Sequence, residues 1–406
     1  MTADGRRRAA AESTAVTFLL SALLAITPFT LDIALPALPS VAAAFGGDAG
    51  RVKLMIALFL LGMAGGQLLY GPASDRLGRR PVLLGALGLY LAATILCAVA
   101  PSLEWLLAAR FVQGLGACAG PVIARAIVRD VYEPVRGARV LSLAAMGMSL
   151  APIVAPLTGG LLVRWTDWRI VFVVLAVFAT LLVGATALVL PETNAAERRA
   201  RTSRSFVAGY LVVVRNPLFV GYVLTLSAGS VGLFAWLSGS PFVLMTWLGL
   251  PPELYGVAFA TVSLGQLGGA ALAARLAGTL GIERTVATGL VLYLAGGATL
   301  AGFILAGFAH PAAIVGPMAL FQFGNGLVMP NVIAGAVAPF PRHAGAASAL
   351  AGFLQMVSGA LSGMLLGAVH DGSARPMGFL VAAAAVAATL AFRLVVWPRR
   401  ARREPA

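Results

Sequence analysis

The chain has 406 residues, of which 60% are hydrophobic and only 11% are charged. A mean hydropathy of +0.92 excludes a soluble globular protein, because such a chain cannot cover its own apolar surface. The formal net charge of +14 lies mostly between apolar runs, so it indicates orientation in a membrane and not a nucleic-acid partner.

Apolar runs of about twenty residues recur along the chain, and each is long enough to cross a bilayer as a helix. A helix satisfies its own backbone hydrogen bonds in lipid, and the runs lack the alternation typical of strands. We therefore expect an all-α membrane protein with twelve transmembrane helices. The expected spans are 16–36, 53–73, 81–100, 104–128, 138–163, 169–190, 217–243, 253–277, 285–308, 311–337, 345–369 and 376–397.

A polar central stretch separates two sets of six spans, and the two halves resemble each other. Shifting the sequence by half its length places Leu61–Leu91 over Leu264–Leu294 with the spacing of Gly, Leu and Tyr residues retained. Two pseudo-symmetric six-helix bundles are typical of transporters, whose substrate cavity lies between halves that rock against each other. The expected units are a tail 1–15, a bundle 16–190, a linker 191–216, a bundle 217–397 and a tail 398–406.

The basic residues predict which face of the membrane each segment occupies. With a cytoplasmic N-terminus, most arginines fall on the inner side, including those of the central linker. The outer side then holds only Arg51, Lys53, Arg164, Arg169 and Arg375. We therefore expect both termini in the cytoplasm, with the linker either a helix on the anionic inner leaflet or a solvated loop.

Charge is concentrated in the turn between spans 2 and 3, within the sequence GPASDRLGRR. A carboxylate on a short, rigid turn can dock on a neighbouring helix or an arginine in one conformation and release it in another. The alternative is that the charges only fix the orientation of the chain. The expected conformational gate comprises Gly71, Asp75, Arg76, Gly78, Arg79 and Arg80.

Two ionisable residues fall well inside the spans of the first half, where they are costly unless paired or hydrated. Asp32 lies about one turn from the outer end of span 1, and Arg110 lies in span 4 with Gln113 on the same helical face. Because the two charges reach similar depth, we expect them to meet. Asp32 is the expected proton carrier and Arg110 its modulator; the alternative is an ion pair that only braces the first bundle.

The second half offers polar but uncharged side chains inside its spans. With Asp32, Arg110 and Gln113, they are expected to line a mostly apolar substrate cavity, although each is equally suited to bonding between helices. These residues are Gln266, Gln322, Asn325, Asn331 and Gln355.

Nothing in the sequence indicates a cofactor, a metal site or a catalytic set. Cys97 and Cys118 fall inside apolar runs, and the histidines His310, His343 and His370 are scattered at span ends. A phosphate-binding loop is also missing, which argues against an ATP-driven pump.

Several motifs together resemble the major facilitator superfamily. The turn between spans 2 and 3 matches its G-x-x-x-D-R-x-G-R-R signature, and Arg110, Gln113 and Gly114 match its R-x-x-Q-G motif. The resemblance implies that Asp75 latches against the start of span 11, near 343–348, when the inner side is closed. In the second copy of the turn the charged positions hold Gly278, Thr279, Ile282 and Glu283, so this latch would be one-sided.

Span 5 resembles the motif associated with antiporters, in which small residues let helices 5 and 8 pack closely. Ala151 and Ala155 replace two of its glycines, and the matching packing residues are Pro152, Pro156, Gly159 and Gly160. The combined pattern is similar to the Bcr/CflA branch of drug:proton antiporters. This resemblance implies export of small drugs across a bacterial inner membrane, with protons moving in.

Three other functions remain to be separated from proton-coupled drug export. The same fold also serves proton-coupled uptake of a nutrient or metabolite, which the direction of proton movement distinguishes. A non-transporting sensor would bind drug without flux, and a membrane enzyme would need a convergent catalytic set. The expected partners are a small-molecule substrate, protons and the lipid bilayer, and a monomer suffices for this architecture.

Overall fold

The computed structural model describes residues 13–194 and 206–401. Within these ranges the chain forms helices joined by short turns, without strands, and twelve helical segments are long and apolar enough to cross a membrane. The predicted all-α fold with twelve spans is confirmed. The predicted tails 1–15 and 398–406 and the linker 191–216 lie partly outside the described residues.

The first six spans form the N-terminal bundle. Their helices are α2 (Thr14–Asp32), continued by η1 (Leu35–Ala37) and α3 (Leu38–Ala44), α4 (Ala49–Val52) with α5 (Leu54–Leu77), α6 (Arg79–Ala98), α7 (Leu103–Val131), α8 (Pro134–Trp165) and α9 (Ile170–Val189).

The last six spans form the C-terminal bundle, which the short helix α11 (Phe206–Val214) precedes. Their helices are α12 (Pro217–Pro241) with η2 (Phe242–Trp247), α13 (Pro252–Leu280), α14 (Ile282–Leu305), α15 (Pro311–Val337), α16 (Ala344–Ala368) and α17 (Arg375–Ala391) with η3 (Phe392–Val396) and α18 (Trp397–Ala401).

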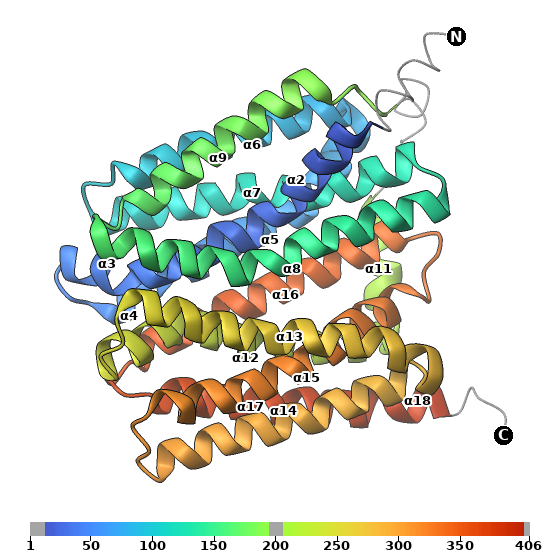
Figure 1. The fold of residues 1–406 in the computed structure, drawn as a ribbon. Helices are drawn as coiled ribbons and strands as arrows, with labels where there is room; N and C mark the ends of the chain where they lie inside the picture. Colours follow the sequence, from blue (N-terminus) through green and yellow to red (C-terminus); the bar gives the residue numbers. More distant parts are fainter. Residues whose placement is uncertain (1–12, 195–205, 402–406) are drawn as a thin grey trace.

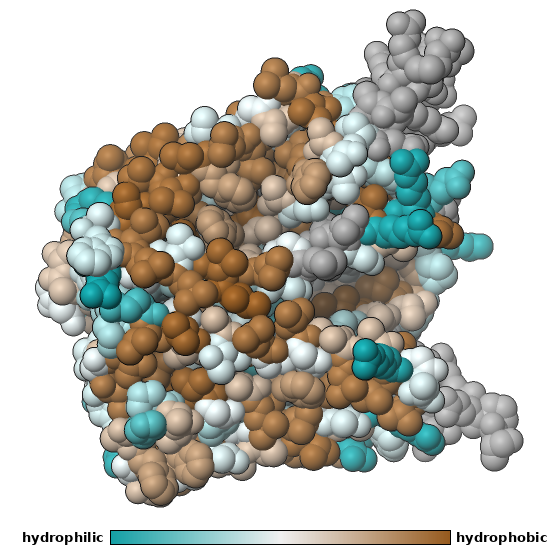
Figure 2. All heavy atoms as spheres, viewed as in Figure 1, coloured by the Kyte–Doolittle hydropathy of each residue, from teal (hydrophilic) through white to brown (hydrophobic). Residues whose placement is uncertain are grey.

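The two bundles lie side by side, and the start of α2 and the end of α18 lie at the same end of the molecule (Figure 1). Two pairs of helices make the main contacts between them, α5 with α16 and α8 with α13. On the face shown in Figure 2, apolar side chains cover most of the flank of both bundles, and hydrophilic ones gather mainly at the two ends. This distribution fits a protein whose flank contacts lipid and whose ends contact water.

The internal repeat seen in the sequence is also present in the backbone. Gly78 and Gly281 occupy equivalent positions, and both have a positive φ, of 105° and 80°. Each lies between two long helices, where a side chain would strain this conformation. The matching turns join α5 to α6 in the first bundle and α13 to α14 in the second.

The first span is longer than the sequence predicts. We expected it to end at Pro36, but the helical chain continues from Thr14 to Ala44. Pro36 and Pro39 each fall at the first positions of a new helical segment, η1 and α3. A proline at that position costs little, because the N–H that it lacks would have no helical partner there.

Candidate functional site

A cavity of about 360 Å³ lies between the two bundles, lined by helices from both. It contains four of the predicted cavity residues, Asp32, Gln266, Gln322 and Gln355. The Gln322 amide donates to Gln266 Oε1 at 3.2 Å, and the Gln355 amide lies 4.0 Å from Met329 Sδ. These side chains can offer hydrogen bonds to a molecule in an otherwise apolar space.

Asp32 supplies the carboxylate of this cavity. It is the last residue of α2, a helix that contains Pro28, and its side chain is 4% exposed. No hydrogen bond or ion pair joins its carboxylate to another residue in the described ranges. A buried carboxylate in this situation is costly in its charged form.

Three further polar atoms beside the cavity have no partner in the described part of the chain. They are Thr27 Oγ1, Trp236 Nε1 and Gln322 Oε1, and each belongs to a residue that lines the cavity. Two can donate and one can only accept, so they offer complementary polar groups. Aromatic and thioether side chains form much of the remaining wall, including Phe234, Phe259, Met329 and Met356.

Arg110 does not meet Asp32, which corrects the expectation from the sequence. The Arg110 side chain is 1% exposed inside the N-terminal bundle, where its guanidinium lies 4.5 Å from the Phe59 ring centroid and 5.9 Å from that of Phe172. One of its terminal nitrogens donates to Gln113 Oε1 at 2.6 Å. The position of Arg110 in its span predicts its depth in the membrane but not the direction of its side chain. In the structure this side chain points from α7 toward α5 and α9.

A chain of hydrogen bonds nevertheless links Arg110 to α2. From Gln113 it continues to Thr94 Oγ1 at 2.8 Å, and Thr94 in turn donates to the Tyr90 carbonyl at 2.6 Å. The Tyr90 hydroxyl lies 2.7 Å from Thr30 Oγ1, two residues before Asp32. Arg110 and Gln113 are therefore connected to the cavity through α2, although neither lines it.

Asn325 and Asn331 also lie outside the cavity lining, contrary to expectation. Asn325 is fully buried within the C-terminal bundle and accepts a hydrogen bond of 2.6 Å from the Tyr293 hydroxyl. Asn331 donates to the Leu327 carbonyl of its own helix at 2.8 Å. Both side chains form hydrogen bonds inside the bundle, as polar residues of membrane helices commonly do.

A second cavity, of about 480 Å³, opens between the bundles at the end where α2 begins and α18 ends. Gly71, Asp75 and Arg79 of the predicted gate line one side of it, and the start of α16 lines the other. Arg125 of α7, which the sequence analysis did not single out, is also part of the lining and donates to the Pro121 carbonyl at 2.9 Å.

The gate residues are joined to one another within the N-terminal bundle. The Arg79 guanidinium pairs with Asp75 at 2.6 Å and with Asp130 at 2.9 Å, and it is nearly buried. Arg80 reaches the Ala187 carbonyl at 2.7 Å. Within the described residues Asp75 forms no ion pair or hydrogen bond with α16, and the second cavity lies between the two.

Two residues of the supposed linker hold this turn in place. The Glu192 carboxylate accepts hydrogen bonds from the backbone N–H groups of Arg79 and Arg80, at 2.9 and 3.1 Å. The Asn194 amide donates to the Asp75 carbonyl at 2.9 Å. Both helix ends at the turn are thus capped by residues that follow α9. The sequence analysis missed them because polar residues after a last span look like a solvated connection.

Three of the four predicted packing residues, Pro152, Pro156 and Gly160, lie where the two bundles touch. Gly160 of α8 faces the Pro252 carbonyl of α13, and a Cβ on Gly256 of α13 would lie 2.8 Å from the Pro156 carbonyl. Pro156 lacks an N–H for the Pro152 carbonyl, and Ser263 of α13 approaches that carbonyl at 3.3 Å. Gly159 faces the Ile33 carbonyl of its own bundle.

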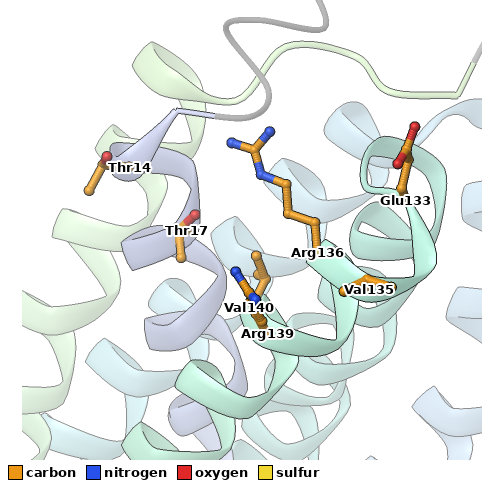
Figure 3. A pocket seen from close by; sticks show the side chains of 7 residues that line it. All are labelled: Thr14, Thr17, Glu133, Val135, Arg136, Arg139 and Val140. Atoms are coloured by element: carbon orange, nitrogen blue, oxygen red, sulfur yellow. The ribbon is translucent and has the colours of Figure 1, made fainter.

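A third hollow, of about 590 Å³, lies at the surface between the start of α2 and the start of α8 (Figure 3). Arg136 and Arg139 point into it beside Thr14 and Thr17. All of its lining residues belong to the N-terminal bundle, so it is separate from the two cavities between the bundles.

Comparison with known proteins identifies the fold. The profile of the Major Facilitator Superfamily matches residues 19–363, most of the chain. The chain belongs to this superfamily. As a major facilitator it is a transporter and not an enzyme, as the sequence analysis predicted.

Relatives agree with the resemblance to the Bcr/CflA branch of the superfamily, which is confirmed. Multidrug resistance protein D of Escherichia coli (strain K12) is 32% identical over 355 residues, 85% of this chain and 87% of that protein. A bicyclomycin resistance protein homolog of Haemophilus influenzae is 29% identical, covering 92% of this chain and 94% of that protein. The MFS-type transporter YdgK of Bacillus subtilis (strain 168) is 33% identical, covering 94% and 95%.

Solved structures show the same fold at lower sequence identity. The D-xylose-proton symporter has a TM-score of 0.77 and 15% identity, with 94% of this chain and 97% of that chain covered. This likeness establishes the arrangement of the twelve helices of the major facilitator fold and carries no argument about substrate.

Proposed function

We propose that this major facilitator exports small amphipathic molecules in exchange for protons, with Asp32 as the proton carrier. The observation that carries the proposal is the Asp32 carboxylate, which is 4% exposed, lines the cavity between the bundles and has no partner in the described residues. A carboxylate so placed is stabilised by a proton or by a cationic group of a substrate, and these two ligands compete for it.

Arg110 acts on Asp32 indirectly in this proposal. The hydrogen bonds from Arg110 through Gln113, Thr94 and Tyr90 to Thr30 hold α2 against the rest of its bundle. Breaking this chain shifts the end of α2 and with it the position of Asp32. Arg110 is thus a positioning residue, and its guanidinium stays charged throughout.

The cavity supports loosely recognised, amphipathic substrates. Its aromatic and methionine side chains adapt to different shapes, while Gln266, Gln322, Gln355 and the Trp236 N–H provide a few polar anchors. Relatives named for resistance to several drugs and to bicyclomycin support export of such molecules. One charge moving down 100 mV releases about 2.3 kcal/mol, enough for roughly a fifty-fold gradient of a neutral substrate.

The gate and the packing residues complete the proposed cycle. Asp75 and Arg79 face the start of α16 across the open cavity, and closure of that cavity brings them to it. The close contact of α8 with α13 at Gly160 and Gly256 is the surface on which the bundles pivot. We place the protein in a bacterial inner membrane with both termini cytoplasmic, from its arginine distribution, and one chain supplies both bundles, so a monomer suffices.

The deciding experiment compares the wild type with Asp32→Asn in an efflux-deficient bacterial host and in inverted membrane vesicles. We expect Asp32→Asn to lose resistance across a drug panel and to lose drug-induced proton movement, because an amide cannot bind a proton in this range. Asp32→Glu retains a carboxyl group, so we expect it to keep part of the coupling.

The matched control is Asp167→Asn, which removes an exposed carboxylate from the same bundle. We expect it to behave as the wild type. Undiminished coupling in Asp32→Asn would rule out Asp32 as the carrier. Protons moving in the same direction as the drug would favour uptake by symport, and drug binding without flux would favour a sensor.

A further inference from the structure

The face opposite the start of α2 and the end of α18 contains a polar contact between the bundles that the proposed function does not use. Lys53, at the junction of α4 and α5 in the N-terminal bundle, places its ammonium 2.8 Å from Nδ1 of His370, which follows α16 in the C-terminal bundle. Lys53 is 2% exposed, and its ammonium also lies 5.2 Å from the centroid of the Phe242 ring in η2. The lysine of one bundle is thus enclosed by the other.

The backbones on this face are also in close contact. A Cβ on Gly50 of α4 would lie 2.7 Å from the Gly367 carbonyl of α16, and one on Gly367 would lie 2.6 Å from the Gly50 carbonyl. The two helices therefore meet without side chains between them. In this conformation the bundles are sealed at this face, while the cavity of about 480 Å³ opens at the other.

The hydrogen bond at the seal depends on the protonation state of His370. With Lys53 charged, its ammonium can only donate, so His370 Nδ1 accepts, which requires a neutral imidazole that carries its proton on Nε2. Protonation of Nδ1 would convert this acceptor into a donor and place two cations side by side. The contact would then change from a bond to a repulsion.

We propose that His370 is a second proton site of this transporter, on its outer face, and that protonation there opens the outer seal by releasing Lys53. This inference goes beyond Asp32 as carrier and rests on the proposed orientation, with this face outside. A proton arriving from an acidic exterior would thereby promote the outward-open state, in which Asp32 can exchange its substrate for a proton.

The charges around His370 support this direction. Burial and the Lys53 ammonium lower the pKa of the His370 imidazole in the sealed state, and the carboxylates of Asp371 and Asp48 oppose that effect. Once the bundles separate, the pKa returns toward the ordinary value of about 6.5. The contact therefore stabilises the sealed state fully above about pH 6.5, and this stabilisation is lost as the pH falls below that value. For one proton, the ratio of sealed to open molecules falls by up to about tenfold per pH unit.

A second link between the bundles on this face is a poorer candidate for such control. Arg164 of α8 pairs with Glu253 of α13 at 2.6 Å, but the arginine is half exposed. Exposed ion pairs contribute little stability, and histidine is the side chain whose charge ordinarily changes between pH 5 and 8. The buried Lys53–His370 contact is therefore the one through which external pH acts.

The test measures the opening of this face directly, apart from transport. Spin labels are attached to Val99→Cys and Leu305→Cys, exposed residues at the ends of α6 and α14 on this face, in a full-length chain whose Cys97 and Cys118 are replaced by alanine. Double electron–electron resonance then gives the distance distribution in lipid nanodiscs at pH 8 and pH 5. We expect a longer-distance population to grow at pH 5 in the otherwise unaltered chain.

Two substitutions of His370 define the outcome. His370→Gln can accept from Lys53 at any pH, so we expect the short distance at both; His370→Arg carries a permanent charge, so we expect the longer distance at both. The matched control, His310→Gln, removes an exposed histidine that caps α15, and we expect it to keep the pH response. An unchanged distribution in the unaltered chain, or the same pH response in His370→Gln, would overturn the proposal.

A further arm separates this proposal from that on Asp32. If Asp32→Asn keeps the pH-dependent opening, His370 drives it, whether or not Asp32 proves to be the carrier. If Asp32→Asn abolishes the opening while His370→Gln retains it, the outer seal responds to Asp32 and the inference about His370 is wrong.

Discussion

At the scale of single residues, Glu192 has a measurable structural role. Its carboxylate accepts from two N–H groups at the start of α6, where the helix dipole also favours a negative charge. We expect Glu192→Ala to lower the free energy of unfolding by about 1–2 kcal/mol, as loss of an N-cap does. The measurement is the thermal unfolding midpoint of the purified protein in detergent.

A suitable control is Glu133→Ala, because Glu133 is the N-cap of α8 but makes no capping hydrogen bond with its side chain. We expect it to leave the midpoint nearly unchanged. Equal effects of the two substitutions would show that Glu192 contributes only its charge.

The candidate site could be predicted only in part from single residues. Depth in the membrane identified Asp32, and the structure places it in the cavity. The same reasoning failed for Arg110 and Asn325, because sequence position fixes the height of a residue in its span but not the direction in which it points. Glu192 was missed because its partners are backbone groups, which leave no side-chain pattern in the sequence.

At the scale of helices, the contact of α8 with α13 depends on the absence of side chains. A Cβ on Gly160 would collide with the Pro252 carbonyl, which is backbone and cannot turn away. We therefore expect Gly160→Val to force the helices apart, at a cost of about 1–3 kcal/mol, as in overpacked cores. Drug efflux should fall while the protein still reaches the membrane.

Gly184 of α9 provides the matched control, because nothing lies within 4 Å of the position of its Cβ. Gly184→Val should transport as the wild type does. Normal efflux by Gly160→Val, at equal protein level, would contradict the role of this contact in the transport cycle.

The positions of the helices could be predicted from the composition of the sequence, whereas some of the helix ends could not. Runs of apolar residues suffice to predict twelve spans because lipid admits few other structures. The end of the first span was misplaced because proline marks both the end of one helical segment and the start of the next. Which of these occurs at Pro36 depends on packing against α8, α12 and α13, contacts that lie far away in the sequence.

At the scale of the whole molecule, two similar bundles carry different chemistry. The repeat preserves the turns at Gly78 and Gly281 and the buried tyrosines Tyr90 and Tyr293. The N-terminal bundle alone supplies Asp32 to the cavity, and the C-terminal bundle supplies the three glutamines. The repeat could be predicted from the sequence, but the conformation could not, because rocking bundles share one sequence in all of their states.

Alternating access predicts that fixing the sealed face stops transport. Ala57 of α5 is fully buried, and a Cβ on Gly363 of α16 would lie 3.3 Å from its Cβ, close to the separation of about 3.5–4.5 Å found in disulfides. We therefore expect Ala57→Cys/Gly363→Cys, in a chain without Cys97 and Cys118, to lose drug efflux from vesicles on oxidation and to regain it with dithiothreitol. Each single substitution should be insensitive to both reagents.

Because the cross-link joins the bundles at one face only, the cavity at the other face should stay accessible to a thiol reagent directed at Ser348→Cys. Undiminished efflux by the fully cross-linked protein would mean that substrate crosses without separation of α5 from α16, contrary to the rocking of the two bundles.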